Sequence, residues 1–541
     1  MSCGMTDNAL DIAIQAGEAK AAGGSFDAIV VGSGAAGGLA ASLLCEAGLS
    51  VLVLDAGYKT PFWKRPLSKT TETAIKAIAN PKLIKVIPYR VINFGRKFLR
   101  AIGRIRQPIQ TECFSWEQGP GGFVDDRDHP YVTPQGRPFT WIRSHGLGGR
   151  MVLPGHGWQY YRLGEEDLSP ADNQSPTWPV SYNELDKWYA FVETRLKLAG
   201  REDHVPSPPD GVISRELSFS AAENQLAGAI SKRWSKSTPI MGRFAPPLQS
   251  LAQAADTGRL VCRVRALVQR LSIGNDGRID GVEWRDQKTG HVETSSAPLV
   301  FLCASTLETT RILLMSKGAN GKAPGAESDA LGRNLMDHLM IRIEGIGPKL
   351  PTDSTPDENG RCVYLPRFDH SFHDDRTKRG FGVQIYPTPT GAQSWLTAVA
   401  FAEVTPRSSN RVTLDESRKD VWGNPALKID FQYSSAELEV GRVMANALRE
   451  IANVAKAKVR AFDGVPARPG TSIHECGTAR MGSDRTNSVL DPNNECWDVP
   501  GLFVTDGASF PSQGAQNPTL TIMALTARAC DYAVKRIKAP A

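Results

Sequence analysis

The sequence predicts an α/β fold in which a parallel sheet flanked by helices is combined with a second domain built on another sheet. Three observations support this. Residues 26–57 read as strand, glycine turn, helix and second strand, residues 298–318 repeat the strand-to-helix unit, and residues 341–462 are rich in alternating strand segments. At 541 residues the chain exceeds one ordinary domain, so we expect two domains.

The first strand, residues 28–31, runs directly into the glycine turn GSGAAG at residues 32–37. Gly32 permits the tight turn, and Gly34 lets the backbone approach a pyrophosphate. Gly37 lets the following helix pack close to the strand. The free amides and the dipole at that helix start, at Ala35 and Ala36, favour phosphate groups.

The second strand, residues 50–54, leads to Asp55 and Ala56, and Asp55 lies 23 positions after Gly32. An acid at this spacing accepts hydrogen bonds from the two ribose hydroxyls of an adenosine. The unit therefore favours FAD or NAD(H) over a cofactor with a 2′-phosphate. Its geometry alone does not choose between flavin and nicotinamide.

The remaining elements follow from periodicity and turn residues. Ser181 is expected to cap a helix that presents Leu185, Trp188, Tyr189 and Val192 on one face and ends at Gly200. We predict strands in residues 259–273 and 277–286 joined by the turn GNDGR, then a strand in 298–305 and a helix in 306–318. Segments 411–417 and 426–434 are predicted strands of the second domain.

Composition excludes several classes of protein. The net charge of +6 is small, and although residues 96–106 gather five basic residues, we expect a solvated or partner-facing helix there and no nucleic-acid binding. Nine cysteines without CxxC spacing favour a reducing compartment and no metal site. Neither a signal-like start nor an apolar run of about 18 residues is present, so a cytoplasmic location is expected, with periplasmic co-export beside a signal-bearing partner as the alternative.

The C-terminal region carries the strongest motifs: HECGTARMG at 474–482, VTDGAS at 504–509 and NPTLTIMAL at 517–525. With PLVFLCASTLETTRILLMS at 298–316, LGRNLMDH at 331–338 and the glycine turn, this series resembles the glucose-methanol-choline (GMC) family of flavoprotein oxidoreductases. The resemblance implies FAD as cofactor and a Rossmann-like FAD-binding domain formed by residues 24–60, 135–157, 212–340 and 463–541. It implies a connecting, partner-facing segment at 61–134 and a substrate-binding domain at 158–211 and 341–462.

By this resemblance, His474 occupies the position of the catalytic base and Asn517 that of its polar partner. A neutral imidazole, with an ordinary pKa near 6.5, suits proton removal from a hydroxyl while hydride passes to flavin N5. The other cofactor positions implied by the family are Gly149, Arg150, Val268 at the adenine, Ala304, Ser305, Asp506, Gly507, Pro518 and Thr519.

Some family members hold FAD covalently through a histidine in a GGxxxH arrangement. The position four residues after Gly149 is Leu153 in this chain, so we predict noncovalent FAD, although His156 lies three residues further on.

The stretch GGRMVLPGHGWQYYR resembles the bacterial branch that contains glucoside 3-dehydrogenases and related sugar oxidoreductases, but it has PGHGWQYYR where that branch has WGRQSYR. Trp158, Gln159, Tyr161 and Arg162 are the implied substrate contacts. We therefore predict oxidation of a CH-OH group of a sugar or glycoside, with carbon 3 as a candidate, by a dehydrogenase rather than an oxidase.

Several alternatives remain open at this stage. The substrate is otherwise a non-sugar alcohol, or the protein is a flavin-containing lyase or a sugar-binding or electron-transfer subunit without turnover of its own. The electron acceptor is a quinone, a cytochrome or oxygen, and a small partner subunit is a further expectation.

Overall fold

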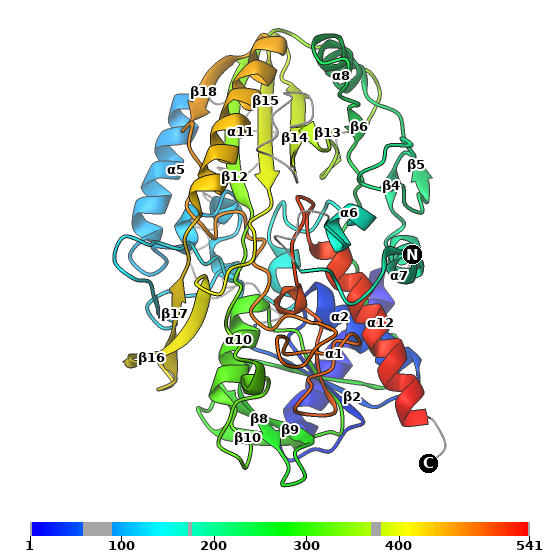
Figure 1. Cartoon of the computed structure of the whole chain (residues 1–541), viewed down its shortest axis with the longest axis vertical. Helices are drawn as coiled ribbons and strands as arrows, with labels where there is room; N and C mark the ends of the chain where they lie inside the picture. Colours follow the sequence, from blue (N-terminus) through cyan, green and yellow to red (C-terminus); the bar gives the residue numbers. More distant parts are fainter. Residues whose placement is uncertain (1–2, 58–88, 171–175, 357, 369–379, 539–541) are drawn as a thin grey trace.

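The computed structural model describes residues 3–57, 89–170, 176–356, 358–368 and 380–538. The first part of the predicted connecting segment, residues 61–88, lies outside them. The structure confirms a mixed α/β fold with a five-stranded parallel sheet, two antiparallel sheets of six and three strands, and two small further sheets (Figure 1).

The parallel sheet is formed by segments that lie far apart in the sequence. Its strand order is β19-β11-β1-β2-β7. Ile29 of β1 is in register with Leu52 of β2 on one side and Val300 of β11 on the other. The five strands are β1 (Ala28–Val31), β2 (Val51–Asp55), β7 (Leu260–Val264), β11 (Val300–Leu302) and β19 (Leu502–Val504).

Helices cover this sheet because its strands are apolar on both faces. The helix after the glycine turn, α2 (Ala35–Glu46), packs against α12 (Thr519–Lys538) and α9 (Ser250–Asp256). The N-terminal α1 (Cys3–Lys20) packs against β7, where Gly17 approaches the backbone of β7 so closely that a Cβ would lie 2.1 Å from the Cys262 carbonyl oxygen.

An antiparallel sheet of β8 (Ala266–Ile273), β9 (Ile279–Asp286) and β10 (Val292–Ser296) follows β7. The single strand predicted over residues 259–273 is therefore two strands. Arg265, with a φ of 59°, separates them, so that β7 joins the parallel sheet and β8 leaves it. The predicted helix is present as α10 (Thr306–Met315).

The second domain contains a six-stranded antiparallel sheet, in the order β18-β12-β15-β14-β13-β6. Apolar residues of β12, β14 and β15 face α11 (Ser435–Val454) and α8 (Ala221–Arg233), while the alternate residues face away from these helices. The strands are β6 (Ile240–Met241), β12 (Leu339–Gly347), β13 (Val363–Leu365), β14 (Phe381–Pro389), β15 (Ser394–Ala402) and β18 (Lys458–Phe462).

Two sequence assignments differ from this arrangement. Helix α8 and strand β6, placed by us in the FAD-binding range 212–340, pack with the six-stranded sheet because their apolar residues complete its core. Conversely, β16 (Arg411–Lys419) and β17 (Pro425–Asp430) form a small sheet with β3 (Tyr131–Val132) and contact α10, outside the six-stranded sheet.

Helix α7 (Tyr182–Leu196) begins as predicted, because Ser181 accepts a hydrogen bond from the Glu184 amide. It ends at Leu196, four residues before the predicted Gly200, because Lys197 adopts a left-handed conformation.

The other short elements are α6 (Glu165–Leu168), β4 (Ala199–Gly200), β5 (Arg215–Glu216), η2 (Gln110–Glu112), η3 (Trp116–Gln118), η4 (Pro120–Gly122), η5 (Gly149–Val152), η6 (Ala326–Ser328) and η8 (Gly507–Ser509).

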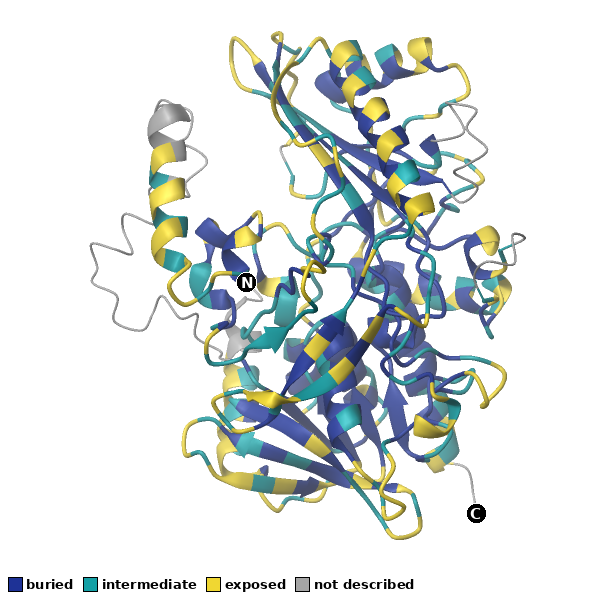
Figure 2. Ribbon diagram, turned by 60° about the vertical axis from the view of Figure 1, so that its left-hand side comes forward, coloured by how far each residue is buried: buried dark blue, intermediate teal, exposed yellow. Residues whose placement is uncertain are grey.

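The basic run at residues 96–106 overlaps α5 (Tyr89–Gly103), which carries exposed residues along its outer side (Figure 2). Three of its arginines are paired with nearby acids: Arg100 with Glu117, Arg104 with Glu112, and Arg106 with Asp125 and Asp128. Much of the positive charge is thereby compensated within the segment.

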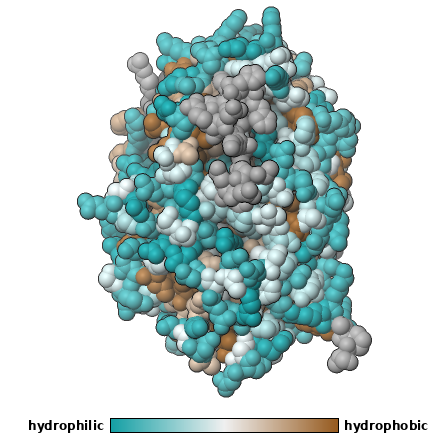
Figure 3. All heavy atoms as spheres, viewed as in Figure 1, coloured by the Kyte–Doolittle hydropathy of each residue, from teal (hydrophilic) through white to brown (hydrophobic). Residues whose placement is uncertain are grey.

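The surface seen in Figure 3 is mainly hydrophilic, with hydrophobic residues in small separate groups. No helix among the described residues is both long and apolar enough to span a membrane. The eight cysteines from Cys45 to Cys530 are buried and free, and no group of three or more metal-ligating side chains is found among the described residues.

Candidate active site

A cavity of about 1290 Å³ lies between the parallel sheet and the six-stranded sheet. One wall is built from the glycine turn, the end of β2 and the start of α10. The opposite wall is built from the outward-facing residues of β12, β14 and β15. The two sheets therefore supply one site from opposite sides.

The glycine turn is packed tightly on one side and open on the other. A Cβ at Gly37 would lie 1.9 Å from the Gly32 carbonyl oxygen, so only glycine lets α2 approach the turn this closely. A Cβ at Gly34 would meet nothing within 4 Å, and Gly34 lines the cavity. The backbone at Gly34 is thus accessible to a ligand.

Asp55 lines the cavity at the end of β2 and also holds the turn. One carboxylate oxygen accepts hydrogen bonds from the Ser33 amide, at 2.8 Å, and from the Ser33 hydroxyl. The other oxygen accepts from the Gly57 amide at 2.6 Å. Burial raises the pKa of Asp55 above its ordinary value, while these hydrogen bonds oppose the shift.

The structure gathers nearly all predicted cofactor positions at the cavity. Gly37 is the exception, because it lies at the contact between helix and strand. The positions that line the cavity are Gly32, Gly34, Ala35, Ala36, Asp55, Ala56, Gly149, Arg150, Val268, Ala304, Ser305, Asp506, Gly507, Asn517, Pro518 and Thr519.

Arg150 and Asp506 connect the loops around this part of the cavity. Arg150 donates to Glu475 Oε2 at 2.6 Å and to Ser305 Oγ at 3.1 Å. Asp506 accepts from the Ala508 amide at 3.0 Å at the start of η8, and burial raises its pKa to about 6. Three distant segments of the chain are thereby held together at one point.

His474 and Asn517 meet at the cavity wall, with Asn517 Nδ2 3.3 Å from His474 Nε2. The loop that carries His474 is held by Asp337, which accepts from the His474 amide at 2.9 Å and from the Gly470 amide at 2.7 Å. Asp337 belongs to the LGRNLMDH segment, so this segment positions the histidine loop.

The buried His338 lies in contact with the half-buried His474. His474 Nδ1 is 2.8 Å from Nδ1 of His338, and burial lowers the pKa of His338 to about 4. Burial also lowers the pKa of His474 well below its ordinary 6.5, and the nearby His338 and Arg150 add to this effect. His474 is therefore a neutral imidazole at pH 7.

The opposite wall carries polar and aromatic residues that the sequence analysis did not identify. Gln384 and Tyr386 point into the cavity from β14, and Gln384 Nε2 donates to Asn517 Oδ1 at 2.7 Å. Phe401 of β15 lies with its ring centre 5.2 Å from that of His474. The signal available in the sequence was the alternation of polar and apolar residues in FGVQIYPT, which places Gln384 and Tyr386 on one face of the strand.

The four predicted substrate contacts separate into two pairs. Trp158 and Gln159 line the cavity. Tyr161 is fully buried outside the cavity lining and stacks on Tyr364 with a ring-centre distance of 4.5 Å, so the structure gives its predicted substrate contact no support.

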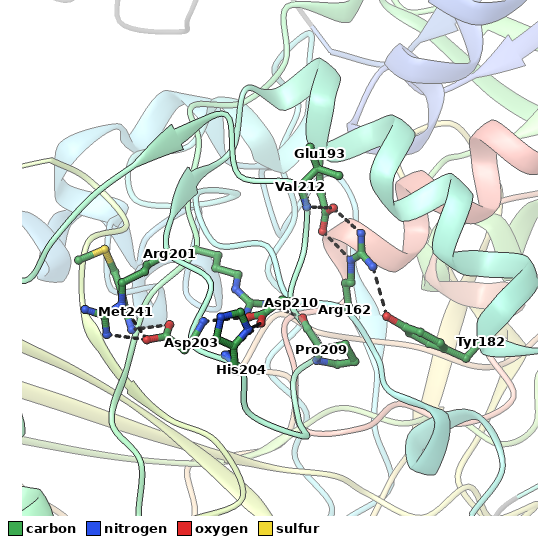
Figure 4. Close-up of polar contacts among 11 residues, drawn as sticks. Arg162, Tyr182, Glu193, Arg201, Asp203, His204, Pro209, Asp210, Val212 and Met241 are labelled. Carbon is green, nitrogen blue, oxygen red and sulfur yellow. Dashed lines mark hydrogen bonds and ion pairs between the residues drawn. The ribbon is translucent and has the colours of Figure 1, made fainter.

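Arg162 likewise lies outside the cavity lining, and the structure shows it in a structural ion pair instead. Its guanidinium donates to both carboxylate oxygens of Glu193, at 2.9 and 2.6 Å, and to the Tyr182 hydroxyl at 3.2 Å (Figure 4). Trp158 and Gln159 at the start of the segment reach the cavity, whereas Tyr160, Tyr161 and Arg162 are buried and lie outside its lining.

Leu153, at the position of the family's covalent histidine, is buried against the apolar residues Trp116 and Ile142. His156 does line the cavity. Its ring stacks on Phe114 at 4.9 Å, its Nδ1 lies 3.1 Å from the Pro154 carbonyl oxygen, and burial lowers its pKa to about 4.

Comparisons with known proteins agree with the motifs. The profile of the GMC oxidoreductase family matches residues 406–526. The chain is 30% identical over 499 residues to 2-methyl-1,2-propanediol dehydrogenase of Mycolicibacterium austroafricanum, covering 78% of this chain and 86% of that protein. It is also 30% identical over 355 residues to C-glycoside 3-oxidase of Arthrobacter globiformis, covering 62% of each.

The fold is shared with solved structures of low sequence similarity. A structure of Aspergillus oryzae formate oxidase, studied for its FAD modification, superposes with a TM-score of 0.63 at 15% identity and covers 96% of this chain and 99% of that one. The motif series, the cavity between the two sheets and the 30% identity to a relative matched over 86% of its length lead to one conclusion: the chain belongs to the GMC oxidoreductase family.

Proposed function

We propose that this protein is an FAD-dependent oxidoreductase that oxidises a CH-OH group of a sugar or glycoside with His474 as the base. The observation that supports this most directly is the pair formed by His474 Nε2 and Asn517 Nδ2, 3.3 Å apart, on the wall of a cavity that also contains the glycine turn. Base, amide donor and cofactor cradle thus open into one space.

The residues of the chain supply proton removal and orientation. His474 is neutral because burial lowers its pKa, so its Nε2 is ready to accept the hydroxyl proton of the substrate. Asn517 Nδ2 carries two hydrogens, of which one faces His474 and the other is available to the substrate oxygen. FAD, when bound, supplies the two-electron acceptor for the hydride that leaves the carbon.

The residues present fit FAD. The open backbone at Gly34 suits a pyrophosphate at the start of α2, and Asp55 lies at the strand end where a ribose is expected. The cavity of about 1290 Å³ exceeds the range of about 300–1,000 Å³ usual for a single ligand, as a dinucleotide together with a substrate requires. We propose that FAD is bound noncovalently, because Leu153 offers no atom for a covalent bond.

The wall opposite the glycine turn supports a polyhydroxylated substrate. Gln159, Gln384 and Tyr386 present amide and hydroxyl groups, and Trp158 adds an aromatic ring suited to the apolar face of a sugar. The similarity to a C-glycoside 3-oxidase points the same way and makes carbon 3 of a glycoside the first candidate for oxidation.

We propose dehydrogenase rather than oxidase activity, with a quinone or a cytochrome preferred to oxygen as acceptor. The similarity to a relative named as a dehydrogenase over 78% of this chain supports this order. We also propose that residues 61–134 contact a small partner subunit and that the protein is cytoplasmic.

A small non-sugar alcohol is the second candidate substrate, since the relative that matches over 499 residues is a 2-methyl-1,2-propanediol dehydrogenase. Such a diol would leave much of the polar wall without a partner. A glycoside would occupy it.

The proposal is tested by mixing the purified flavoprotein anaerobically with O-glycosides, C-glycosides, free sugars, 2-methyl-1,2-propanediol and simple alcohols, while absorbance is followed at about 450 nm. We expect bleaching with a glycoside and far slower bleaching in the matched His474→Gln protein. Bleaching with the diol alone would select the second candidate. Carbonyl product formed while the flavin stays oxidised would instead identify a lyase.

A further inference from the structure

His474 belongs to a chain of hydrogen bonds that ends at the Gly514 carbonyl oxygen, which can accept a hydrogen bond but cannot donate one. The Gly514 carbonyl oxygen lies 2.8 Å from His338 Nε2, so this nitrogen must carry a proton. Because burial keeps His338 neutral, its Nδ1 then holds a lone pair. His474 Nδ1, 2.8 Å from that lone pair, must donate, and the remaining nitrogen of His474, Nε2, is left without a proton.

The other end of the line fixes the orientation of Asn517. Gln384 Nε2 donates to Asn517 Oδ1 at 2.7 Å, so the Asn517 amide nitrogen is the atom turned toward His474 Nε2. Gln384 is oriented in turn by Tyr386, whose hydroxyl donates to Gln384 Oε1 at 3.2 Å. Gln159 Nε2 contacts the Tyr386 hydroxyl at 2.5 Å, so the line starts at a residue of the cavity wall.

Every donor and acceptor in this line has one assignment, and all of them agree. We propose that His338 and Gln384 are positioning residues that hold His474 as the Nδ1–H tautomer, with the Nε2 lone pair facing Asn517 and the cavity. The catalytic consequence rests on the proposed function, because only a base on His474 needs that lone pair. The assignment of the tautomer does not rest on the proposed function.

The burial of His338 limits how this residue can act on catalysis. His338 is 1% exposed and lies outside the cavity lining, so it acts on a bound substrate only through His474. Without an acceptor at position 338, the Nδ1–H of His474 would lose its hydrogen-bond partner inside the protein, which is unfavourable. Moving the proton to Nε2 would avoid this cost and would abolish the base.

The direct test is ¹⁵N NMR of the flavoprotein labelled at the histidine rings, with the His474 signals assigned by their loss in His474→Gln. In the unmutated protein we expect a protonated Nδ1 and an unprotonated Nε2 on His474. His338→Gln should keep this pattern, since its amide both accepts from His474 and donates to Gly514. His338→Leu should move the proton to Nε2 and slow substrate-dependent flavin reduction by about 10- to 10³-fold with KM little changed.

Gln384→Glu provides a second variant that leaves His338 intact. A carboxylate cannot donate to Asn517 Oδ1, so the Asn517 amide should reverse and present its oxygen to His474, again favouring a proton on Nε2. Finding the Nε2–H tautomer in the unmutated protein would overturn the proposal, as would an unchanged Nδ1–H tautomer in both His338→Leu and Gln384→Glu. Since NMR reads the tautomer without turnover, lack of activity on every alcohol would refute the proposed function and leave this result standing.

Discussion

At the scale of single residues, the chemistry depends on His474 and on how its ring is held. Replacing it with alanine removes the proton acceptor and leaves the glycine turn and Asp55 unchanged. We expect His474→Ala to slow anaerobic flavin reduction by about 10²- to 10⁴-fold, the usual scale for a lost general base. Stopped-flow absorbance with saturating substrate measures this.

The control for this variant is its flavin content, which should equal that of the unmutated protein. A reduction rate that stays the same in His474→Ala would remove His474 from the mechanism. A loss of FAD together with the rate would show that the histidine contributes to the cofactor cradle as well.

The pH dependence follows from the direction of the His474 pKa. Burial lowers this pKa below the ordinary 6.5, so the ring stays unprotonated as the pH falls through 6.5 and loses its base function only at lower pH. We therefore expect kcat/KM to stay level from about pH 8 down to 6.5, with its acid limb below that value. A rate that is already halved at a pH above 6.5 would contradict the assignment.

The sequence predicted His474 and Asn517 because both lie in long motifs that are readable without a structure. It did not identify Gln384 or Tyr386, whose roles depend on the pairing of β14 with β15 and on which face of that sheet meets the cavity. The role of His338 was equally out of reach. Its motif was recognised, but its contact with a ring 136 positions away is a property of the fold.

At the scale of elements, the segment from Trp158 to Arg162 illustrates why a motif can mislead. Its composition suits a sugar site throughout, yet only its first two residues, Trp158 and Gln159, line the cavity. Arg162 instead ties the segment to α7 through Glu193, and both side chains are almost completely buried, at 5% and 1% exposure.

This ion pair should govern stability and leave substrate binding unaffected. Removing one partner of a buried pair leaves an uncompensated charge, so Arg162→Ala should destabilise the fold by about 3–5 kcal/mol. Thermal unfolding followed by tryptophan fluorescence should show the lowered midpoint. KM should change little in the folded fraction.

The double variant Arg162→Met, Glu193→Leu is the matched control, since it removes both charges and should recover much of the loss. Gln159→Ala gives the opposite pattern, a raised KM with a nearly unchanged midpoint. If Arg162→Ala raised KM and kept the midpoint, the arginine would return to the substrate site.

The division of residues 259–273 into β7 and β8 is a second case at this scale. The apolar pattern is continuous, and local propensity indicates one strand. The break at Arg265 lets β7 extend the parallel sheet while β8 turns to bring Val268 to the cavity. Only the tertiary arrangement requires the break.

At the scale of the whole molecule, the fold class and the two-sheet plan could be predicted because they rest on strand-and-helix patterns of considerable length. The domain limits could not, because α8 and β6 belong to the second sheet although they precede it by about a hundred residues of sequence. The cavity is lined by residues of both sheets, so a ligand that fills it would contact both.

A cofactor held only by noncovalent contacts across both sheets should be removable and should stabilise the fold. The position of the family's covalent histidine is Leu153, buried in an apolar cluster, and the nearby His156 is stacked on Phe114 with its Nδ1 facing the Pro154 carbonyl. We expect acid precipitation to leave the yellow flavin in the supernatant. The apoprotein should then unfold at a lower temperature, with about 2.7 kcal/mol restored when free FAD reaches 100 times its Kd. A yellow pellet would contradict noncovalent binding, and loss of that colour in His156→Ala but not in the matched His129→Ala would identify His156 as the point of attachment.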